Sequence, residues 1–290
     1  MRRRSTKLVS PAVDALRQID EWAAAHAAAA VVRPDGVAAS HGPAGHVFGW
    51  ASVTKLATAL ATLVAVEEGV VDLDDAAGPE GATVRHLLAH ASGLPFDGGP
   101  PIARAGERRI YSNLGFEALA EHVGGRAEMA FDRYLAEAVF EPLGMAAELR
   151  GSAGADVHGT LDDAVRLARE LLTPTLLAPE TLAEATTVVF PGLNGVLPGF
   201  GRLEPMDWGL GFELKDGKPR HWSGTLTSPR TFGHFGGSGT FLWVDPERSL
   251  ALVVLSDREF GDWAKVAWPA LSDAVVSAGC APSPIGEDRP

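Results

Sequence analysis

Hydrophobic and polar positions along the chain follow two periods. From residue 11 to about residue 30, Ala, Leu, Ile and Trp recur at helical spacing, and Pro11 suits a first helical turn, so we predict a helix there. Two short strands around a Pro-Asp-Gly turn are predicted for AAVVRPDGVAASHG. A further helix, starting at about residue 52 and stopping at Gly69, is predicted for FGWASVTKLATALATLVAVEEG.

The middle of the chain, from residue 83 to about 190, has mainly helical periodicity. Its amphipathic segments end before proline or at glycine, and one of them begins at Thr160, a predicted N-cap followed by two aspartates. The stretch 191–206 is rich in Gly, Pro and Leu, and we predict a loop. After about residue 207 the pattern becomes β-rich, with DPERS as a predicted hairpin connection, and residues 262–278 return to helix.

The order of elements is helix, strands, many helices, strands and helix. It predicts an α/β fold of the α+β type, in which an antiparallel sheet built from both chain ends is flanked by helices and carries a mainly helical inserted lobe. We expect residues 1–290 to form a single domain of two lobes. Residues 1–60 and 205–280 would form the α/β lobe, residues 61–204 the helical lobe, and residues 281–290 a disordered tail.

Charge and composition restrict the possible partners and the compartment. The net charge of −12 disfavours nucleic acid or an anionic membrane surface as a partner. Acidic residues follow the basic start, where a signal peptide would have an apolar core, and the longest apolar-looking run is far below the roughly 20 residues of a membrane span. The lone Cys280 cannot form an internal disulfide. We therefore expect a cytoplasmic protein, and the sequence leaves its oligomeric state open.

Candidate chemistry begins with Ser52 and Lys55 at the start of the apolar helix. Residues three apart share a helix face, and a helix N-terminus favours developing negative charge. A serine hydroxyl becomes nucleophilic when a base takes its proton, which a desolvated lysine can do. The motif is also frequent by chance, because a capping serine followed by a surface lysine produces it too.

Two later segments carry further polar groups. Tyr111 and Asn113 lie just before a predicted helix; a tyrosine beside an ammonium can have a lowered pKa and act as a base or proton shuttle, while Asn113 can donate to a substrate carbonyl. His234 lies among glycines in TFGHFGGSGTFLWVDP, where a substrate could lie against the strand edge. A loop tyrosine, a capping asparagine and a bulged edge strand are the alternative interpretations.

The three elements S-x-x-K, Y-x-N and H-x-G together resemble the class C β-lactamase-like serine hydrolases, which include family VIII esterases and D-alanyl-D-alanine peptidase relatives. HLLAHASGLP and FEPLGM resemble that family too, and the resemblance covers roughly residues 30 to 278. It implies a β-lactamase/transpeptidase-like fold without a cofactor. It also implies that Ser52 is the acylated nucleophile and that Lys55 and Tyr111 share the general acid/base work. Asn113 would then bind a polar group of the substrate, and His234 would tune Tyr111 or bind substrate.

The same resemblance assigns the rest of the site and shows where this chain departs from the family. The N–H groups of Ser52 and Gly237 would form an oxyanion hole, with Gly236 beside them. Phe235 stands where β-lactamases usually carry Thr or Ser that helps hold a carboxylate, and His234 replaces a lysine, which lowers the positive charge at neutral pH. Both changes favour a neutral, apolar ester or amide, so we expect Phe235, and with it Trp222, to line an apolar pocket.

The expected function is therefore a serine hydrolase that cleaves small ester or amide substrates through an acyl-serine intermediate. A transacylase using the same acyl-enzyme, a β-lactamase or D-amino-acid peptidase, and a catalytically inactive binding module on the same fold remain alternatives. His86 and His90 are four residues apart on a predicted helix and could suit a metal. No third ligand accompanies them, so we expect no metal site.

Overall fold

The core of the computed structural model, which describes residues 11–218 and 220–279, is a six-stranded antiparallel sheet in the order β2-β1-β12-β11-β10-β9. Strands from the two ends of the chain meet in its interior, where Ala27 lies opposite Ser256. The prediction of an antiparallel sheet built from both chain ends is confirmed. The strands are β1 (Ala27–Arg33), β2 (Gly36–His41), β9 (Glu213–Leu214), β10 (Phe232–Gly236), β11 (Thr240–Asp245) and β12 (Leu250–Ser256).

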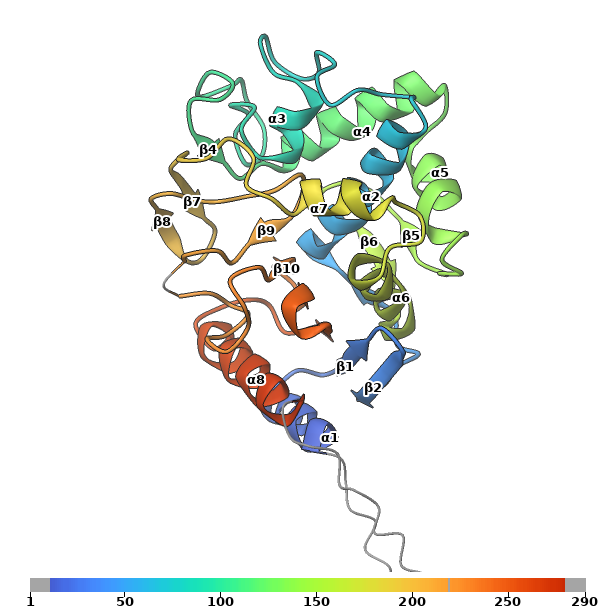
Figure 1. Ribbon diagram of the computed structural model, residues 1–290, viewed down its shortest axis with the longest axis vertical. Coiled ribbons are helices and arrows are strands. Elements are labelled where there is room, and N and C mark those ends of the chain that lie inside the picture. Colours follow the sequence, from blue (N-terminus) through green and yellow to red (C-terminus); the bar gives the residue numbers. More distant parts are fainter. Residues whose placement is uncertain (1–10, 219, 280–290) are drawn as a thin grey trace, which may run out of the picture.

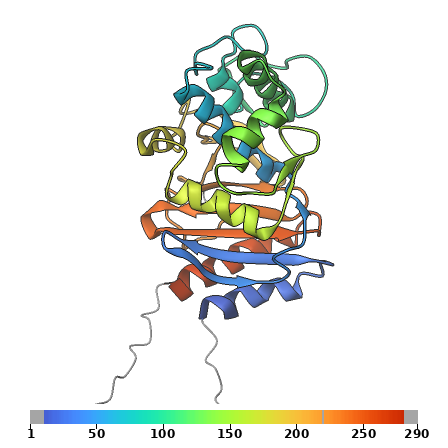
Figure 2. The same ribbon diagram turned by 90° about the vertical axis from the view of Figure 1, so that its right-hand side faces the viewer.

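Helices cover both faces of this sheet. On one face, α1 (Pro11–Leu16) and α8 (Ala264–Gly279) pack together, and on the other α6 (Leu161–Leu172) lies across β1, β11 and β12, as Figure 2 shows. Successive side chains of a strand point to opposite faces. Ala29 of β1 accordingly belongs to the core under α1 and α8, whereas Ala28 and Ala30 belong to the larger core on the side of α6.

The helical lobe is built around α2 (Thr54–Glu67), whose residues from Thr54 to Ala65 are all buried. This helix runs from the sheet into the lobe (Figure 1). Gly69 follows it with φ +71°, the predicted left-handed stop, and Thr160 caps α6 in a reciprocal pair with Asp163, as predicted. The remaining helical elements are η1 (Arg17–Glu21), η2 (Ala51–Val53), α3 (Val84–Leu88), α4 (Asn113–Ala127), α5 (Phe131–Leu135), η3 (Ala136–Phe140), α7 (Pro179–Ala185) and η4 (Pro246–Arg248).

Two smaller sheets accompany the main one. One has the order β3-β6-β5 and the other β4-β7-β8, with β4 and β7 parallel. The prediction of a loop over 191–206 is wrong, since a hairpin forms there; β7 finds its backbone partner in distant β4, which local sequence does not reveal. The strands are β3 (Phe48–Gly49), β4 (Arg109–Ile110), β5 (Glu148–Leu149), β6 (Val157–Gly159), β7 (Gly195–Leu197) and β8 (Gly201–Leu203).

The predicted helix over 11–30 is also too long. Helical structure ends at Glu21, and the alanines from Ala27 onward form β1 instead. Alanine favours helix, but this segment pairs with β2 on one side and β12 on the other and is buried over most of its length. Tertiary pairing therefore overrides local propensity here.

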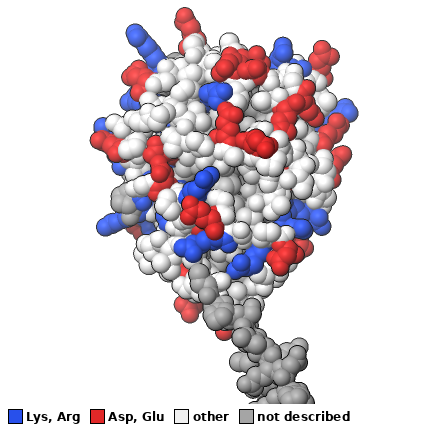
Figure 3. All heavy atoms as spheres, viewed as in Figure 1, with Lys and Arg blue, Asp and Glu red and all other residues white. Residues whose placement is uncertain are grey.

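The surface of the described residues carries charges of both signs. Figure 3 shows one face, on which Lys and Arg side chains are interspersed with Asp and Glu. Among residues 11–218 and 220–279, no helix combines the length and the apolar character that crossing a membrane requires. The predicted disordered tail 281–290, the basic start and Cys280 lie outside the described residues.

Candidate active site

Ser52 lies in η2, the single 3-10 turn that leads into α2. The preceding residue, Ala51, has φ +45°, a left-handed conformation that is unusual for a residue other than glycine and that persists only when the surroundings hold it. Two hydroxyls do so here: Ser238 Oγ donates to the Gly49 carbonyl at 2.8 Å and Thr240 Oγ1 to the Trp50 carbonyl at 2.8 Å. The turn that carries Ser52 is therefore fixed to β11 and to the segment before it.

Lys55 is fully buried one turn beyond Ser52, and its Nζ lies 3.3 Å from Ser52 Oγ. It also donates to Asn113 Oδ1 at 2.6 Å and to the Gly154 carbonyl at 2.7 Å. Burial lowers the pKa of Lys55 to about 7, although the negative charges of Asp97 and Glu117 act to raise it. Near neutral pH much of this lysine is therefore the free amine, which can accept a proton from a hydroxyl.

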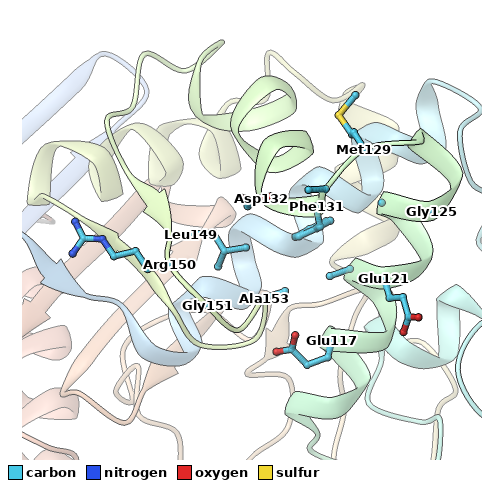
Figure 4. A pocket seen from close by; sticks show the side chains of 13 residues that line it. Glu117, Glu121, Gly125, Met129, Phe131, Asp132, Leu149, Arg150, Gly151 and Ala153 are labelled. Carbon is cyan, nitrogen blue, oxygen red and sulfur yellow. The ribbon is translucent and has the colours of Figure 1, made fainter.

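The loop that supplies the Gly154 carbonyl is anchored from two sides. Thr58 Oγ1 of α2 donates to the Ala153 carbonyl at 2.7 Å, and the hydroxyl of Ser152 donates to the carboxylate of Glu117. Figure 4 shows Glu117 pointing from α4 toward this loop, at the wall of a cavity of about 630 Å³ between α4, α5 and the loop. These contacts hold the carbonyl that receives the lysine hydrogen bond.

Tyr111 lies between β4 and α4, with its ring centroid 4.8 Å from Lys55 Nζ and its side chain almost buried. Burial raises the pKa of Tyr111 above its usual value, and a hydrogen bond with Ser52 opposes this only in part. The expectation of a lowered pKa is therefore wrong, because burial outweighs the hydrogen bond with Ser52, and the charges of Glu213 and Asp97 also raise the pKa. The phenol keeps its proton at neutral pH, which suits a proton donor.

His234 lies beside Tyr111 on β10. Its Nδ1 is 2.6 Å from the Phe235 carbonyl oxygen, and since a carbonyl only accepts, Nδ1 carries the proton and Nε2 is free to accept from the Tyr111 hydroxyl at 3.4 Å. Burial lowers the pKa of His234 to about 3, and Lys55 acts in the same direction. The imidazole is therefore neutral and adds no positive charge to the site.

Asn113 is the first residue of α4, and its amide links two charged groups. The oxygen accepts from Lys55, and Nδ2 donates to Asp97 Oδ1 at 3.1 Å. The turn before it is held by His90, whose Nδ1 accepts from the Ser112 N–H at 3.1 Å and whose ring lies 4.6 Å from that of Tyr111. His86 instead contacts the Thr83 hydroxyl at 2.9 Å, so the two histidines take part in separate contacts.

The remaining predicted residues follow His234 along β10. A Cβ atom on Gly236 would lie 2.5 Å from the Trp50 carbonyl oxygen and 2.9 Å from Ala51 Cβ, so only glycine lets the strand end approach the Ser52 turn this closely. Gly237 comes next, with open space where its side chain would be. This places the end of β10 against the turn that carries Ser52, where the predicted oxyanion hole would form.

Phe235 points to the other face of β10. Its ring lies 5.2 Å from that of Phe260 and 5.8 Å from those of Trp222 and Trp268, inside the core under α8. Trp222 is fully buried, and its indole donates to Glu213 at 2.8 Å. The structure thus brings Ser52, Lys55, Tyr111, Asn113 and His234 together but turns Phe235 and Trp222 into the core, so their contact with substrate stays a prediction.

Sequence reasoning missed several residues that support this site. Gly154, Glu117 and Asp97 position or perturb Lys55, and His90 supports Tyr111. A Cβ on Gly154 would lie 3.3 Å from Lys55 Nζ, so a larger residue here would press on the lysine amine. The small-residue turn GSAGADVHG was visible in the sequence, but nothing local connected it to α2.

Comparison with known proteins agrees with this fold and arrangement. The model of the Beta-lactamase family matches residues 14–148 and 146–275, and the chain belongs to this family. It therefore falls within the β-lactamase-fold hydrolases. The solved structure of a β-lactamase from Mycobacterium bovis superimposes with a TM-score of 0.90 at 54% sequence identity, covering 91% of this chain and 99% of that one.

More distant relatives differ in the activities that their names give. A Salmonella typhi protein named "Putative D-alanyl-D-alanine carboxypeptidase" is 25% identical over 223 residues, covering 61% of this chain and 51% of that protein, so the chain spans about half the length of the curated relatives it matches. The structure of a hydrolase described as having promiscuous acyltransferase activity superimposes with a TM-score of 0.75 at 18% identity, covering 92% and 97% of the two chains. At that identity the likeness concerns the fold alone.

Proposed function

We propose that this protein is a serine hydrolase that cleaves small, neutral ester or amide substrates through an acyl-enzyme on Ser52. The observation that carries the proposal is the fully buried Lys55 amine, 3.3 Å from Ser52 Oγ, with its pKa lowered to about 7. A lysine whose ammonium group reached solvent would keep its charge and would not be surrounded by protein on all sides. The buried amine gives Ser52 a base at neutral pH.

The proposed acylation step uses the two groups that flank Ser52. Lys55 takes the hydroxyl proton as Ser52 Oγ bonds to the carbonyl carbon, and the N–H groups of Ser52 and Gly237 stabilise the resulting oxyanion. The bond to the leaving oxygen or nitrogen then breaks, and Tyr111 gives that atom its phenolic proton. The Lys55 ammonium returns a proton to Tyr111. Water then repeats the sequence in reverse, which frees the acid and restores the Ser52 hydroxyl.

The charges around the site support the proposal of a neutral substrate. His234 is neutral, and Lys55 is only partly charged near pH 7, so no strong permanent cation among the five gathered side chains favours a substrate carboxylate. Asp97, which accepts from Asn113, adds negative charge at the rim. An uncharged ester or amide avoids this unfavourable environment.

The Ser52→Ala variant tests the proposal. We expect turnover of a short p-nitrophenyl ester to fall by about 10³-fold or more, since removal of a nucleophile removes the covalent route. Intact-mass measurement should show one acyl adduct on the wild type and none on the variant. Ser40→Ala, at an exposed serine of β2, is the matched control and should retain full activity. Full esterase activity of Ser52→Ala would overturn the assignment.

β-Lactam hydrolysis is the second candidate, favoured by the 54% identity to a structure named a β-lactamase. The same acyl-enzyme chemistry would open a lactam ring, so the two candidates differ in substrate and not in mechanism. Nitrocefin separates them: turnover of this anionic lactam faster than that of neutral esters would favour the second candidate. A transacylase differs from both only in the acceptor, and added alcohols would show it as ester products.

A further inference from the structure

Ser152, in the loop between β5 and β6, ties Gly154 to a charged group outside the candidate active site. Its Oγ accepts a hydrogen bond from the Gly154 N–H at 3.1 Å, and its hydroxyl donates to the Glu117 carboxylate. A serine hydroxyl has one proton to donate, so the carboxylate fixes the direction of that proton. The lone pairs of Oγ are then free to accept the Gly154 N–H.

The peptide group between Ala153 and Gly154 is consequently held at both ends. Its N–H donates to the serine hydroxyl, and its oxygen, the Ala153 carbonyl, accepts from Thr58 Oγ1 of α2 at 2.7 Å. The next carbonyl along the chain, that of Gly154, accepts from Lys55 Nζ at 2.7 Å. A continuous series of contacts therefore runs from the Glu117 carboxylate through the loop to the Lys55 amine.

Helix α4 thus reaches Lys55 by two routes. Asn113 accepts directly from Nζ at 2.6 Å, whereas Glu117, four residues later and so on the same face of the helix, acts through the loop. Figure 4 shows Glu117 pointing from α4 toward the loop, with Glu121 one turn further along the helix. Glu121 is exposed and is not among the charges that act on Lys55.

The titratable groups around Lys55 come from several elements. Burial keeps three of them uncharged at neutral pH, because it raises the pKa of a phenol and lowers the pKa of two imidazoles: Tyr111, His90 and His234. The carboxylates of Asp97, in the loop before β4, and of Glu117 favour the charged lysine. Asp97 also accepts from Asn113 within the site, whereas the hydrogen bond of Glu117 goes to the loop.

We propose that Glu117 is a positioning residue for Lys55, which holds the loop in place through Ser152 and opposes loss of the lysine proton through its charge. The inference rests on the proposed function, in which Lys55 must be neutral to take the Ser52 proton. The two effects on the rate are opposite. The hydrogen bond keeps the lysine where the reaction needs it, and the negative charge favours the unreactive ammonium, so Glu117 limits activity at acidic pH.

The variant Glu117→Gln separates the two effects, because an amide oxygen can still accept from the Ser152 hydroxyl but carries no charge. We expect the rise of kcat/KM with pH to move to lower pH, so that at pH 5.5 the variant is about two- to fivefold faster than the wild type. A substitution that only damaged the structure would not produce this gain. Glu121→Gln removes the same charge one turn further along α4 and, as the matched control, should keep the wild-type profile.

The variant Ser152→Ala removes the hydrogen bond and leaves the charge. We expect kcat/KM to fall by about tenfold at every pH, because the Gly154 N–H loses its partner and the carbonyl that receives the lysine hydrogen bond moves. The midpoint of urea unfolding, measured for each variant, identifies any general loss of structure.

The protonation of Lys55 can also be followed without catalysis. In protein labelled with ¹³C-lysine, the Cε resonance of Lys55, assigned by its absence from Lys55→Arg, reports the state of the amine by NMR. Its titration should move to lower pH in Glu117→Gln and stay unchanged in Glu121→Gln. A wild type that forms no acyl-enzyme would remove the proposed function, whereas this resonance would still test the effect of Glu117 on Lys55.

Three results would contradict the role of Glu117. An unchanged titration of Lys55 in Glu117→Gln would mean that the charge does not act on the amine. Equal displacements in Glu117→Gln and Glu121→Gln would mean that the effect is not particular to Glu117. Wild-type kcat/KM at every pH in Ser152→Ala would mean that the hydrogen bond does not position the loop.

Discussion

At the scale of single residues, the site depends on one ionisable group kept away from water. Lys55 has no exposed surface, and two of its hydrogen bonds go to oxygen acceptors, Asn113 Oδ1 and the Gly154 carbonyl. Burial favours the neutral amine, whereas the acceptors and the carboxylates of Asp97 and Glu117 favour the ammonium. The balance leaves the lysine able to change its protonation state near neutral pH, as a base in catalysis must.

This balance predicts the pH dependence of catalysis. Because the pKa of Lys55 is lowered to about 7, its reactive neutral form is scarce at low pH and predominates above pH 7. We expect kcat/KM for a neutral ester to rise about tenfold per pH unit below this value and to level off above it. The Tyr111 phenol, with its raised pKa, should produce no loss of activity up to pH 9.

The measurement is kcat/KM from pH 5.5 to 9 with a substrate that does not ionise. Circular dichroism over the same range is the control, since it separates titration of the site from unfolding. Titration of His234 cannot cause the rise of kcat/KM in this range, because the pKa of His234 is lowered to about 3. A flat profile, or activity that falls as the pH rises, would contradict the role of Lys55 as base.

At the scale of elements, the loop between β5 and β6 positions the lysine, although none of its side chains is placed in the proposed chemistry. The loop is tied to α2 through Thr58, which donates to the Ala153 carbonyl, and the start of β6 is tied to the same helix through Thr54 Oγ1, which accepts the Val157 N–H at 2.9 Å. A loop bound this way presents the Gly154 carbonyl at a fixed place. Small displacements of such a group have large effects on rate.

The variant Gly154→Ala tests the role of this loop. The new Cβ would lie 3.3 Å from both Lys55 Nζ and Asn113 Oδ1, which is closer than the amine can tolerate without moving. We expect kcat/KM to fall by about tenfold to a hundredfold, because the lysine loses its position. The rise of kcat/KM with pH, which reports the Lys55 amine, should move to a different pH. The free energy of unfolding should change by less than about 2 kcal/mol.

Gly125→Ala is the matched control for this loop variant. Its Cβ would meet nothing within 4 Å on α4, so activity should be unchanged and stability should rise by about 0.5–1 kcal/mol. If Gly154→Ala kept wild-type activity and its kcat/KM rose over the same pH range as in the wild type, the loop would not position Lys55.

The sequence predicts local helices and strands and the side chains with recognisable chemistry. It does not predict which distant backbone groups contact those side chains or pair with those strands. Ser52, Lys55, Tyr111 and His234 were found because each type of side chain has a recognisable chemistry and setting. The Gly154 carbonyl was missed because any residue has one, and only the folded loop aims it at Lys55. Likewise β7 was missed because its partner β4 lies far away in the chain.

Phe235 shows the limit of extrapolating from neighbours in a strand. It stands where the resembling family usually carries a substrate-holding Thr or Ser, so it was expected to line an apolar pocket, but adjacent residues in a strand face opposite sides. The structure puts His234 beside Tyr111 and Phe235 among the rings of Trp222, Phe260 and Trp268. A contact between Phe235 and substrate therefore stays a prediction, and its ring packs in the core under α8.

At the scale of the whole molecule, the predicted lobes share elements. The boundary predicted at residue 60 falls inside α2, and α6, assigned to the helical lobe, packs on β1, β11 and β12. A single large core includes residues of α2, α4, α6 and one face of the sheet. Separating the lobes would expose this core, so we predict that they do not unfold independently.

Equilibrium unfolding in urea measures this directly. All seven tryptophans lie within the ranges 1–60 and 205–280, so their fluorescence reports the predicted α/β lobe, whereas circular dichroism at 222 nm also reports the helices of 61–204. We expect the two signals to give one coincident transition. Two separated midpoints would show that the lobes are independent units.

The pairing of β1 with β12 has a consequence for synthesis of the chain on the ribosome. When Ala27 leaves the ribosome, its partner Ser256, more than two hundred residues further along the chain, has not yet been added. Translation proceeds at about 5–20 residues per second, so the nascent β1–β2 hairpin waits on the order of ten seconds or more with one edge unpaired. Until then the polypeptide depends on chaperones or on its own helices to keep that edge from foreign strands.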